Sequence, residues 1–374
     1  MLTTIGSGMD FIVHRKDLSQ CKFVSAGIEA DLELDQVLLK VDKFALSANN
    51  ISYAVVGETL GYWDFFPVAD EAWGRIPAWG FAEVLRSKKD NVVEGDRVFG
   101  FVPMSTHVIL QPDGVSPEGF VDASPHRNKF TTLYNQYQLV KHNPLYVPEY
   151  EDHWALFWPL FMSAFLLDEF LNENNFFGAE TILISSASSK TAIALAFLLS
   201  RKRSSQCQVI GLTSPANLPF VKDLGYYSQV LTYDQIQLLP NNLSIMYVDI
   251  AGDKDLLRTL HYYFQNMRYS CLLGATHRKP QSGLEINSKL PGPHPTFFFA
   301  PEEIHKRVQQ LGANVFYEHF GQSWSQFLLS ISEQIVLINN TGKAIIEKTY
   351  LDILAGRSQP NQGYVVSLVL NIST

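Results

Sequence analysis

The chain has 374 residues, more than a single compact domain usually holds, so two domains are expected. Hydrophobic residues make up 46% of the sequence and charged residues 18%, which excludes a disordered chain. The net charge of −8 argues against a nucleic-acid-binding protein. The densest basic stretch, residues 201–203, is typical of a solvated helix end.

Cysteine usage and the termini indicate a cytoplasmic protein. Cys21, Cys207 and Cys271 lie far apart, unlike a disulfide framework or a zinc ribbon, and they fit a reducing compartment. Residues 1–10 lack the basic and apolar regions of a signal peptide. The apolar run at 154–167 is too short for a membrane span, so we expect no membrane contact.

The first 150 residues are rich in short strand-like runs, separated by segments with Gly, Pro and aromatic residues. Strands are predicted at 37–41, from 83 and at 137–140, and residues 91–100 are predicted to form a turn followed by a strand. This pattern is typical of a barrel-like β domain with ordered loops.

The pattern changes at about residue 151, where a long apolar helix is predicted at 154–171. After it, strands at 181–185, 208–212, 229–231, 245–250 and 270–274 alternate with helices at 189–200, 217–224 and 253–264. Such alternation predicts a parallel sheet wrapped by helices, which binds ligands at the carboxyl ends of its strands. The tail is predicted to hold helices at 302–311, 325–338 and 350–356 and a last strand at 364–370.

The first strand of this sheet runs into the next helix through a serine-rich segment, Ser185 to Thr191. At such a junction, backbone amides and the helix dipole form an anion site, and small residues let the backbone approach a pyrophosphate. The candidate cofactor-binding residues here are Ser186, Ser188, Ser189, Lys190 and Thr191.

Two other interpretations of this junction are weighed. The glycine fingerprint of dinucleotide sites is missing, so a serine-rich helix cap stays open as an alternative. A phosphate-binding P-loop is disfavoured, because Ile184 and Ser189 stand where that motif needs glycine.

The end of the second strand favours NADP over NAD. NAD enzymes place an acidic residue there to bind the ribose 2′-hydroxyl, whereas this chain has no acid between Leu212 and Asp223. A carboxylate would repel a 2′-phosphate, while hydroxyls and amides can donate hydrogen bonds to it. We therefore expect Thr213, Ser214 and Asn217 to bind NADP(H), although the same residues would also cap the next helix.

Several segments resemble the medium-chain dehydrogenase/reductase superfamily, on its zinc-independent quinone reductase and enoyl reductase side. They are residues 92–100 (VVEGDRVFG), 224–233 (LGYYSQVLTY), 248–252 (VDIAG) and 350–370. The resemblance implies an α/β protein with a GroES-like β-barrel catalytic domain, residues 1–150 and 315–374. It implies a Rossmann-type doubly wound parallel-sheet domain at 151–314, with the substrate cleft between the domains. Serines and Lys190 replace the glycine-rich loop of the family.

No metal is expected. The zinc-bearing relatives carry Gly-His-Glu where residues 77–82 of this chain read PAWGFA, and the cysteines of a structural zinc lobe are missing. A developing oxyanion would then need hydrogen-bond donors.

The resemblance suggests Tyr53 and Asn49 as the catalytic residues, since quinone reductases of the family have an Asn and then a Tyr lining the nicotinamide cleft. A tyrosine hydroxyl serves there as a donor rather than a base. A core aromatic role for Tyr53 stays open. Gly274 and Ala275 follow another strand and are expected beside the nicotinamide half of the cofactor.

Together these features predict a zinc-free, NADPH-dependent oxidoreductase. Its substrate would be a small quinone or α,β-unsaturated carbonyl compound, and the resemblance suggests a homodimer. The alternative is a non-catalytic dinucleotide-binding or scaffold protein with the same fold. The missing glycine-rich loop supports that alternative.

Overall fold

The computed structural model describes residues 4–29, 31–202, 207–273 and 289–369. The chain divides into two compact units. The first consists of Met1–Leu156, Val336–Ser358 and Gln362–Thr374, and the second of Phe157–Ile335 and Gln359–Asn361. The C-terminal segments Val336–Ser358 and Gln362–Thr374 therefore belong to the same unit as the N-terminal part.

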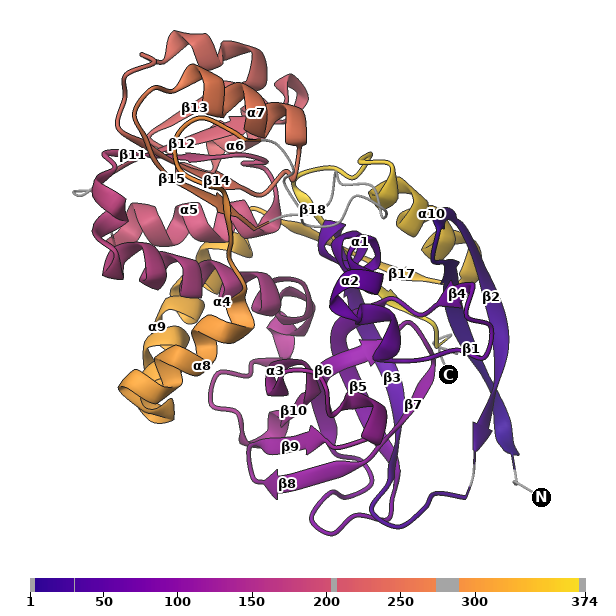
Figure 1. Cartoon of the computed structure of the whole chain (residues 1–374). Coiled ribbons are helices and arrows are strands. Elements are labelled where there is room, and N and C mark those ends of the chain that lie inside the picture. Colours follow the sequence, from indigo (N-terminus) through magenta and orange to yellow (C-terminus); the bar gives the residue numbers. More distant parts are fainter. Residues whose placement is uncertain (1–3, 30, 203–206, 274–288, 370–374) are drawn as a thin grey trace. The chain divides into compact units, whose positions relative to one another are not determined.

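The first unit is built on two sheets (Figure 1). The small sheet has the order β2-β1-β4, formed by β1 (Thr4–His14), β2 (Asp17–Glu29) and β4 (Trp73–Gly74). The large sheet has the order β17-β18-β3-β5-β6-β10-β9-β8, with β7 paired to β3. Its strands are β3 (Val37–Leu46), β5 (Pro77–Ser87), β6 (Arg97–Pro103), β7 (His107–Leu110), β8 (Pro112–Ser116), β9 (Gly119–Asp122), β10 (Gln136–Leu139), β17 (Val336–Thr341) and β18 (Gln362–Ser367). Every pair is antiparallel except β17 with β18.

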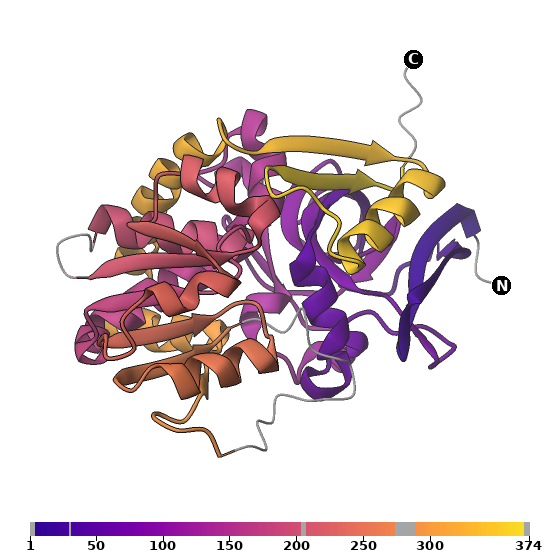
Figure 2. The ribbon, with the colours of Figure 1, turned by 90° about the horizontal axis from the view of Figure 1, so that it is seen from above.

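Helix α10 (Lys343–Leu354) lies beside the N-terminal hairpin, as Figure 2 shows. Its Tyr350 is 1% exposed and donates a hydrogen bond to the Leu18 carbonyl at 2.8 Å. The Tyr350 ring also meets Phe11 edge-on, with ring centroids 5.3 Å apart. These contacts join the two ends of the chain within one core. The other helices of this unit are α1 (Ala48–Val55), α2 (Gly57–Leu60) and α3 (Thr132–Asn135).

The second unit holds a six-stranded, all-parallel sheet in the order β13-β12-β11-β14-β15-β16. Its strands are β11 (Thr181–Ile184), β12 (Gln208–Thr213), β13 (Gln229–Thr232), β14 (Ile245–Asp249), β15 (Met267–Leu272) and β16 (Thr296–Phe297). This is the doubly wound order of dinucleotide-binding folds, in which the direction of winding reverses between β11 and β14. The predicted α/β class and the Rossmann-type sheet are confirmed.

Helices cover both faces of this sheet. Helix α7 (Lys254–Tyr263) packs Leu257 and Leu260 against a core that includes Leu183 and Tyr247. Helix α5 (Lys190–Lys202) lies on the opposite side of the sheet (Figure 1). The remaining helices are α6 (Leu218–Asp223), α8 (Ala300–Leu311) and α9 (Ala313–Ile331). Strands predicted as continuous apolar runs are thus buried from both sides.

The predicted helix at 325–338 is wrong in its bounds. Helix α9 begins at Ala313 and ends at Ile331, and residues 336–338 belong to strand β17. Aromatic packing against α4 (Glu151–Glu173) accounts for the early start, since the rings of Trp158 and Phe320 lie 4.7 Å apart. The chain accordingly returns to the first unit at Val336.

Helix α4 is longer than the apolar run suggested. The stretch Pro148–Glu173 has the length and mean hydropathy of a membrane span, but 78% of its most apolar window is buried inside the protein. Phe161 and Phe165 on this helix are fully buried or nearly so, and Phe161 stacks on Phe327 of α9 at 4.8 Å. Helix α4 is therefore a core helix of a globular unit.

Candidate functional site

The candidate site lies at the carboxyl ends of β11, β12 and β14, around the point where the winding of the sheet reverses. The serine-rich segment leaves β11 here and enters α5. The loop after β12 and the turn after β14 border it on either side.

One set of hydrogen bonds fixes the exit from β11. The buried Ser185 hydroxyl donates to Asp249 Oδ1 at 3.1 Å. The Ser185 hydroxyl oxygen in turn accepts hydrogen bonds from the amides of Ile250 and Ala251 at 2.9 and 3.0 Å. Asp249 Oδ1 also accepts from the Gly252 amide at 2.9 Å. The ends of β11 and β14 are therefore tied together across the switch point.

A second set of contacts holds the next two residues of the loop. The Ser186 amide donates to the Tyr233 hydroxyl at 3.1 Å, and the Tyr227 hydroxyl donates to the Ala187 carbonyl at 2.8 Å. Gly211 on β12 lets the loop pass close to the strand at Ala187, because a Cβ at position 211 would lie 2.8 Å from the Ala187 Cβ. Ser186 has a φ of 50°, in the left-handed region that favours glycine. Tyrosine hydroxyls and a strand glycine thus support a loop that has no glycine of its own.

Sequence reasoning did not assign Asp249, Tyr227, Tyr233 or Gly211 to the site. Tyr227, Tyr233 and Asp249 fall inside segments that carried the resemblance, which is the one signal that pointed to them. The roles of Tyr227 and Gly211 depend on the path of a loop more than 20 residues away in sequence.

Ser189 caps helix α5, so the predicted cap alternative describes part of this loop. Its hydroxyl accepts from the Ala192 amide at 3.3 Å and its carbonyl from the Ile193 amide at 2.9 Å. The amides of Lys190 and Thr191 stand in the first turn, where a helix offers them no internal acceptor. A capped helix start and an anion site are therefore compatible here.

The loop after β12 approaches the serine segment directly. The Asn217 side-chain amide donates to the Ser188 hydroxyl at 2.9 Å. Thr213 is 1% exposed, and its hydroxyl has no hydrogen-bond partner within the part of the chain that the structure describes. Ser214 is half-buried and accepts the Asn217 amide at its carbonyl, 3.1 Å away. The structure thus brings these predicted residues together without an acidic neighbour in the loop.

Lys190 stands at the N-terminal end of α5, which is the positive end of the helix dipole. Its ammonium donates to the Pro360 carbonyl at 2.7 Å. No carboxylate pairs with it among residues 4–29, 31–202, 207–273 and 289–369. Burial lowers the pKa of Lys190 from its ordinary value of 10.5 to about 7. The helix dipole also disfavours a positive charge at this end, so an anion bound here would be stabilised by the lysine and would stabilise it.

The predicted catalytic pair lies in the first unit, on α1. Tyr53 is 8% exposed, and its ring packs on Tyr62 with centroids 4.5 Å apart. Its hydroxyl accepts from Trp79 Nε1 at 3.2 Å, a bond that does not use the phenolic proton. Burial raises the pKa of Tyr53, and hydrogen bonds with Trp79 and Asn49 oppose that rise. Tyr53 is therefore a core aromatic whose hydroxyl is a neutral hydrogen-bond donor.

The remaining predicted residues are placed as follows. Gly274 and Ala275 lie outside the described residues. A metal site built from three or more His, Cys, Asp or Glu side chains is absent from the described ranges.

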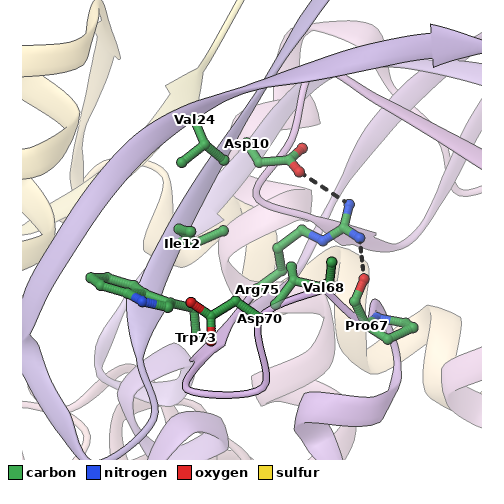
Figure 3. A pocket seen from close by; sticks show the side chains of 9 residues that line it. Asp10, Ile12, Val24, Pro67, Val68, Asp70, Trp73 and Arg75 are labelled. Atoms are coloured by element: carbon green, nitrogen blue, oxygen red, sulfur yellow. Dashed lines mark hydrogen bonds and ion pairs between the residues drawn. The ribbon is translucent and has the colours of Figure 1, made fainter.

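A cavity of about 300 Å³ lies in the first unit, and none of the predicted site residues lines it (Figure 3). It is lined by Asp10, Ile12, Val24, Pro67, Val68, Ala69, Asp70, Trp73 and Arg75. The Arg75 guanidinium pairs with Asp10 at 3.5 Å and donates to the carbonyls of Phe66 and Pro67. The positive charge of Arg75 is thus paired with a carboxylate of the protein itself.

Comparisons with known proteins agree with this architecture. Residues 44–359 match a family described as "Protein of unknown function (DUF2855)". None of the curated proteins matches the sequence.

Several solved structures share the fold over nearly the whole chain. CurA from Vibrio vulnificus in complex with NADPH is 12% identical, with a TM-score of 0.58 over 96% of this chain and 98% of that chain. The yhdH oxidoreductase from Salmonella enterica in complex with NADP is 14% identical, with a TM-score of 0.51 over 96% and 100%. A mutant of Etr1p in complex with NADP and crotonyl-CoA is 13% identical, with a TM-score of 0.54 over 97% and 99%. The chain has the fold of medium-chain dehydrogenase/reductase proteins, which confirms the resemblance found in the sequence.

Lys190→Met is expected to stabilise the protein in a pH-dependent way. The folded-state pKa of Lys190 is below its ordinary value, so the unfolded chain binds the extra proton more readily. The loss in free energy of unfolding that the charged Lys190 causes is fully present below about pH 7. It disappears as the pH rises to 10.5. At pH 6 the variant should therefore gain more than about 1.4 kcal/mol, the value of one pKa unit, in the free energy of unfolding.

Urea unfolding of both proteins at pH 6 and pH 9.5 measures this difference. Lys222→Met, which removes an exposed lysine from α6, is the control and should show no such trend. Equal gains for Lys190→Met at both pH values would contradict the prediction.

Proposed function

The chain belongs to the DUF2855 family, and we propose that it is a zinc-free, NADPH-dependent oxidoreductase. The observation that carries the proposal is the cation of Lys190 beside the start of α5, which has no negative partner among the described residues. Ser188 and Asn217, which are hydrogen-bonded to each other, and the buried Thr213 lie at or after the ends of β11 and β12. This arrangement has the chemistry of an anion site.

The donor set suits NADPH. The first amides of α5 and the Lys190 ammonium would hold the pyrophosphate. The hydroxyls of Thr213 and Ser214 and the amide of Asn217 would hold the 2′-phosphate, because they can donate hydrogen bonds and carry no negative charge. The hydroxyl of Thr213, buried without a partner among the described residues, is a donor that a ligand can satisfy. Solved structures with the same fold hold NADPH or NADP.

The proposed reaction is hydride transfer to a small quinone or α,β-unsaturated carbonyl compound. NADPH supplies the hydride when bound. The Tyr53 hydroxyl, with Asn49 beside it, would donate a hydrogen bond to the oxygen on which negative charge develops. The complex of Etr1p with crotonyl-CoA, an unsaturated thioester, supports this substrate class. We also propose a cytoplasmic homodimer, as the resemblance suggests.

The alternative is a dinucleotide-binding or scaffold protein without turnover. It is favoured by the core packing of Tyr53 and by the loop that lacks glycine. The test is NADPH oxidation, followed at 340 nm, with a panel of enones and quinones. Turnover with any acceptor supports the enzyme, whereas tight NADPH binding without turnover supports the alternative.

Ser214→Asp is expected to remove a preference for NADPH. The unmodified protein should bind NADPH at least tenfold more tightly than NADH, a difference of about 1.4 kcal/mol. A carboxylate at position 214 would repel the 2′-phosphate, so the ratio should fall to one or below. Fluorescence titration measures both affinities. Ser116→Asp adds the same charge at an exposed position of β8 and should keep the preference. Equal affinities in the unmodified protein would refute the assignment.

Tyr53→Phe tests the chemical step. The variant keeps the ring in its packing against Tyr62 and loses only the hydroxyl. Loss of one oxyanion donor typically lowers kcat by about 10²–10³. Once an acceptor is found, kcat at saturating NADPH should fall at least tenfold while NADPH affinity is unchanged. Unchanged kcat would assign Tyr53 to the aromatic core alone.

The purified protein is expected to contain no stoichiometric zinc. The chain has no histidine in residues 77–82, where zinc-bearing relatives place a ligand. Elemental analysis should find well under one zinc per chain. One zinc per chain that survives mild chelation would overturn this part of the proposal.

A further inference from the structure

The ammonium of Lys190 has an uncharged partner that comes from a distant part of the chain. Pro360 stands in the connection between α10 and β18, 170 residues from Lys190 in sequence. Residues Gln359–Asn361 nevertheless belong to the second unit by their contacts. The Pro360 carbonyl accepts one ammonium proton but supplies no negative charge. The lysine is held in place without being neutralised.

The titratable groups around the loop do not compensate this charge. The phenols of Tyr227 and Tyr233 are bonded to the loop backbone at Ala187 and Ser186. On β14, the Asp249 carboxylate accepts hydrogen bonds from the Ser185 and Tyr247 hydroxyls and from the Gly252 amide. The segment 359–361 has no titratable side chain, and before it Asp352 and Arg357 pair with each other at 2.8 Å.

Desolvation is therefore the force that sets the charge of Lys190, and it holds the pKa at about 7. Near neutral pH the free protein is a mixture of the ammonium and the neutral amine. A phosphate group beside the side chain would favour the ammonium strongly, because opposite charges attract most in a poorly solvated site.

We propose that this site takes up a proton at Lys190 when it binds a dinucleotide, so that affinity for the cofactor rises as the pH falls. The inference rests on the proposed function, since it assumes that the loop holds the phosphates of a nucleotide. It adds that Lys190 sets the pH range in which the cofactor is held.

Linkage gives the expected size of the effect. Each binding event should take up about half a proton at pH 7 and close to one proton at pH 8. The dissociation constant should rise by about tenfold per pH unit above pH 7 and be nearly constant below pH 6. Binding coupled to the uptake of one proton by any group would give the same pH dependence. A Lys190 variant is therefore needed to show that Lys190 is the group that takes up the proton.

Isothermal titration calorimetry of the full chain with NADPH tests the proposal. Titrations at pH 6, 7 and 8, each in two buffers with different ionisation enthalpies, give the number of protons taken up. The 2′-phosphate itself titrates near pH 6, so NADH is a second probe, because its pyrophosphate does not titrate in this range. Lys190→Met removes the titrating group, Lys190→Arg keeps a permanent charge, and Lys222→Met is the surface control.

The proposal predicts proton uptake at pH 8 in the unmodified protein and the Lys222 variant, and its loss in both Lys190 variants. Lys190→Arg should bind with nearly the same affinity at pH 7 and pH 8. NADPH binding without uptake, or with uptake that persists in Lys190→Met, would overturn the inference and leave the proposed function standing. A protein that binds neither nucleotide at any pH would refute the proposed function as well.

Discussion

The hydrogen bonds of Ser185 determine the geometry of the candidate site. Its hydroxyl bridges the Asp249 carboxylate and the amides of Ile250 and Ala251, and all of these groups are buried. A buried polar network of this kind is stable only when its members are satisfied, so it permits little variation in the path of the chain. The direction in which the backbone leaves β11, and hence the start of α5, follows from it.

The serine-rich loop shows how a dinucleotide-type junction is built without its usual glycines. Glycine normally allows tight turns and close backbone approach at this position. Here the close approach is provided by Gly211 on the neighbouring strand, and the loop is held by the hydroxyls of Tyr227 and Tyr233. Ser186 retains the left-handed conformation at some conformational cost. The glycine that close backbone approach requires is therefore on the neighbouring strand and not in the loop.

Lys190 illustrates a conflict between stability and binding. A half-buried cation at a helix N-terminus lowers the free energy of unfolding, since desolvation and the helix dipole both act against the charge. The same environment makes it a strong partner for an anion, because little water must be removed when the anion arrives. Residues that weaken the free protein in this way are characteristic of binding sites.

The sequence by itself determined the local features of this protein. Alternating strands and helices predicted the parallel sheet. This prediction succeeded because the alternation depends only on neighbours along the chain. Helix α9 was misplaced because its first two turns are stabilised by rings on α4, which periodicity over a short window does not reveal.

Only the tertiary structure decided how the site is held and charged. The contacts of Ser185 with Asp249 and of Lys190 with Pro360 join residues 64 and 170 positions apart. Neither pair has a local sequence signal, because hydrogen bonding to a distant carboxylate or carbonyl leaves no periodic pattern. The low pKa of Lys190 likewise comes from the protein that surrounds it, since a lysine in the unfolded chain is fully solvated. Sequence thus pointed to candidate residues at the ends of the strands, and burial sets the charge of the lysine among them.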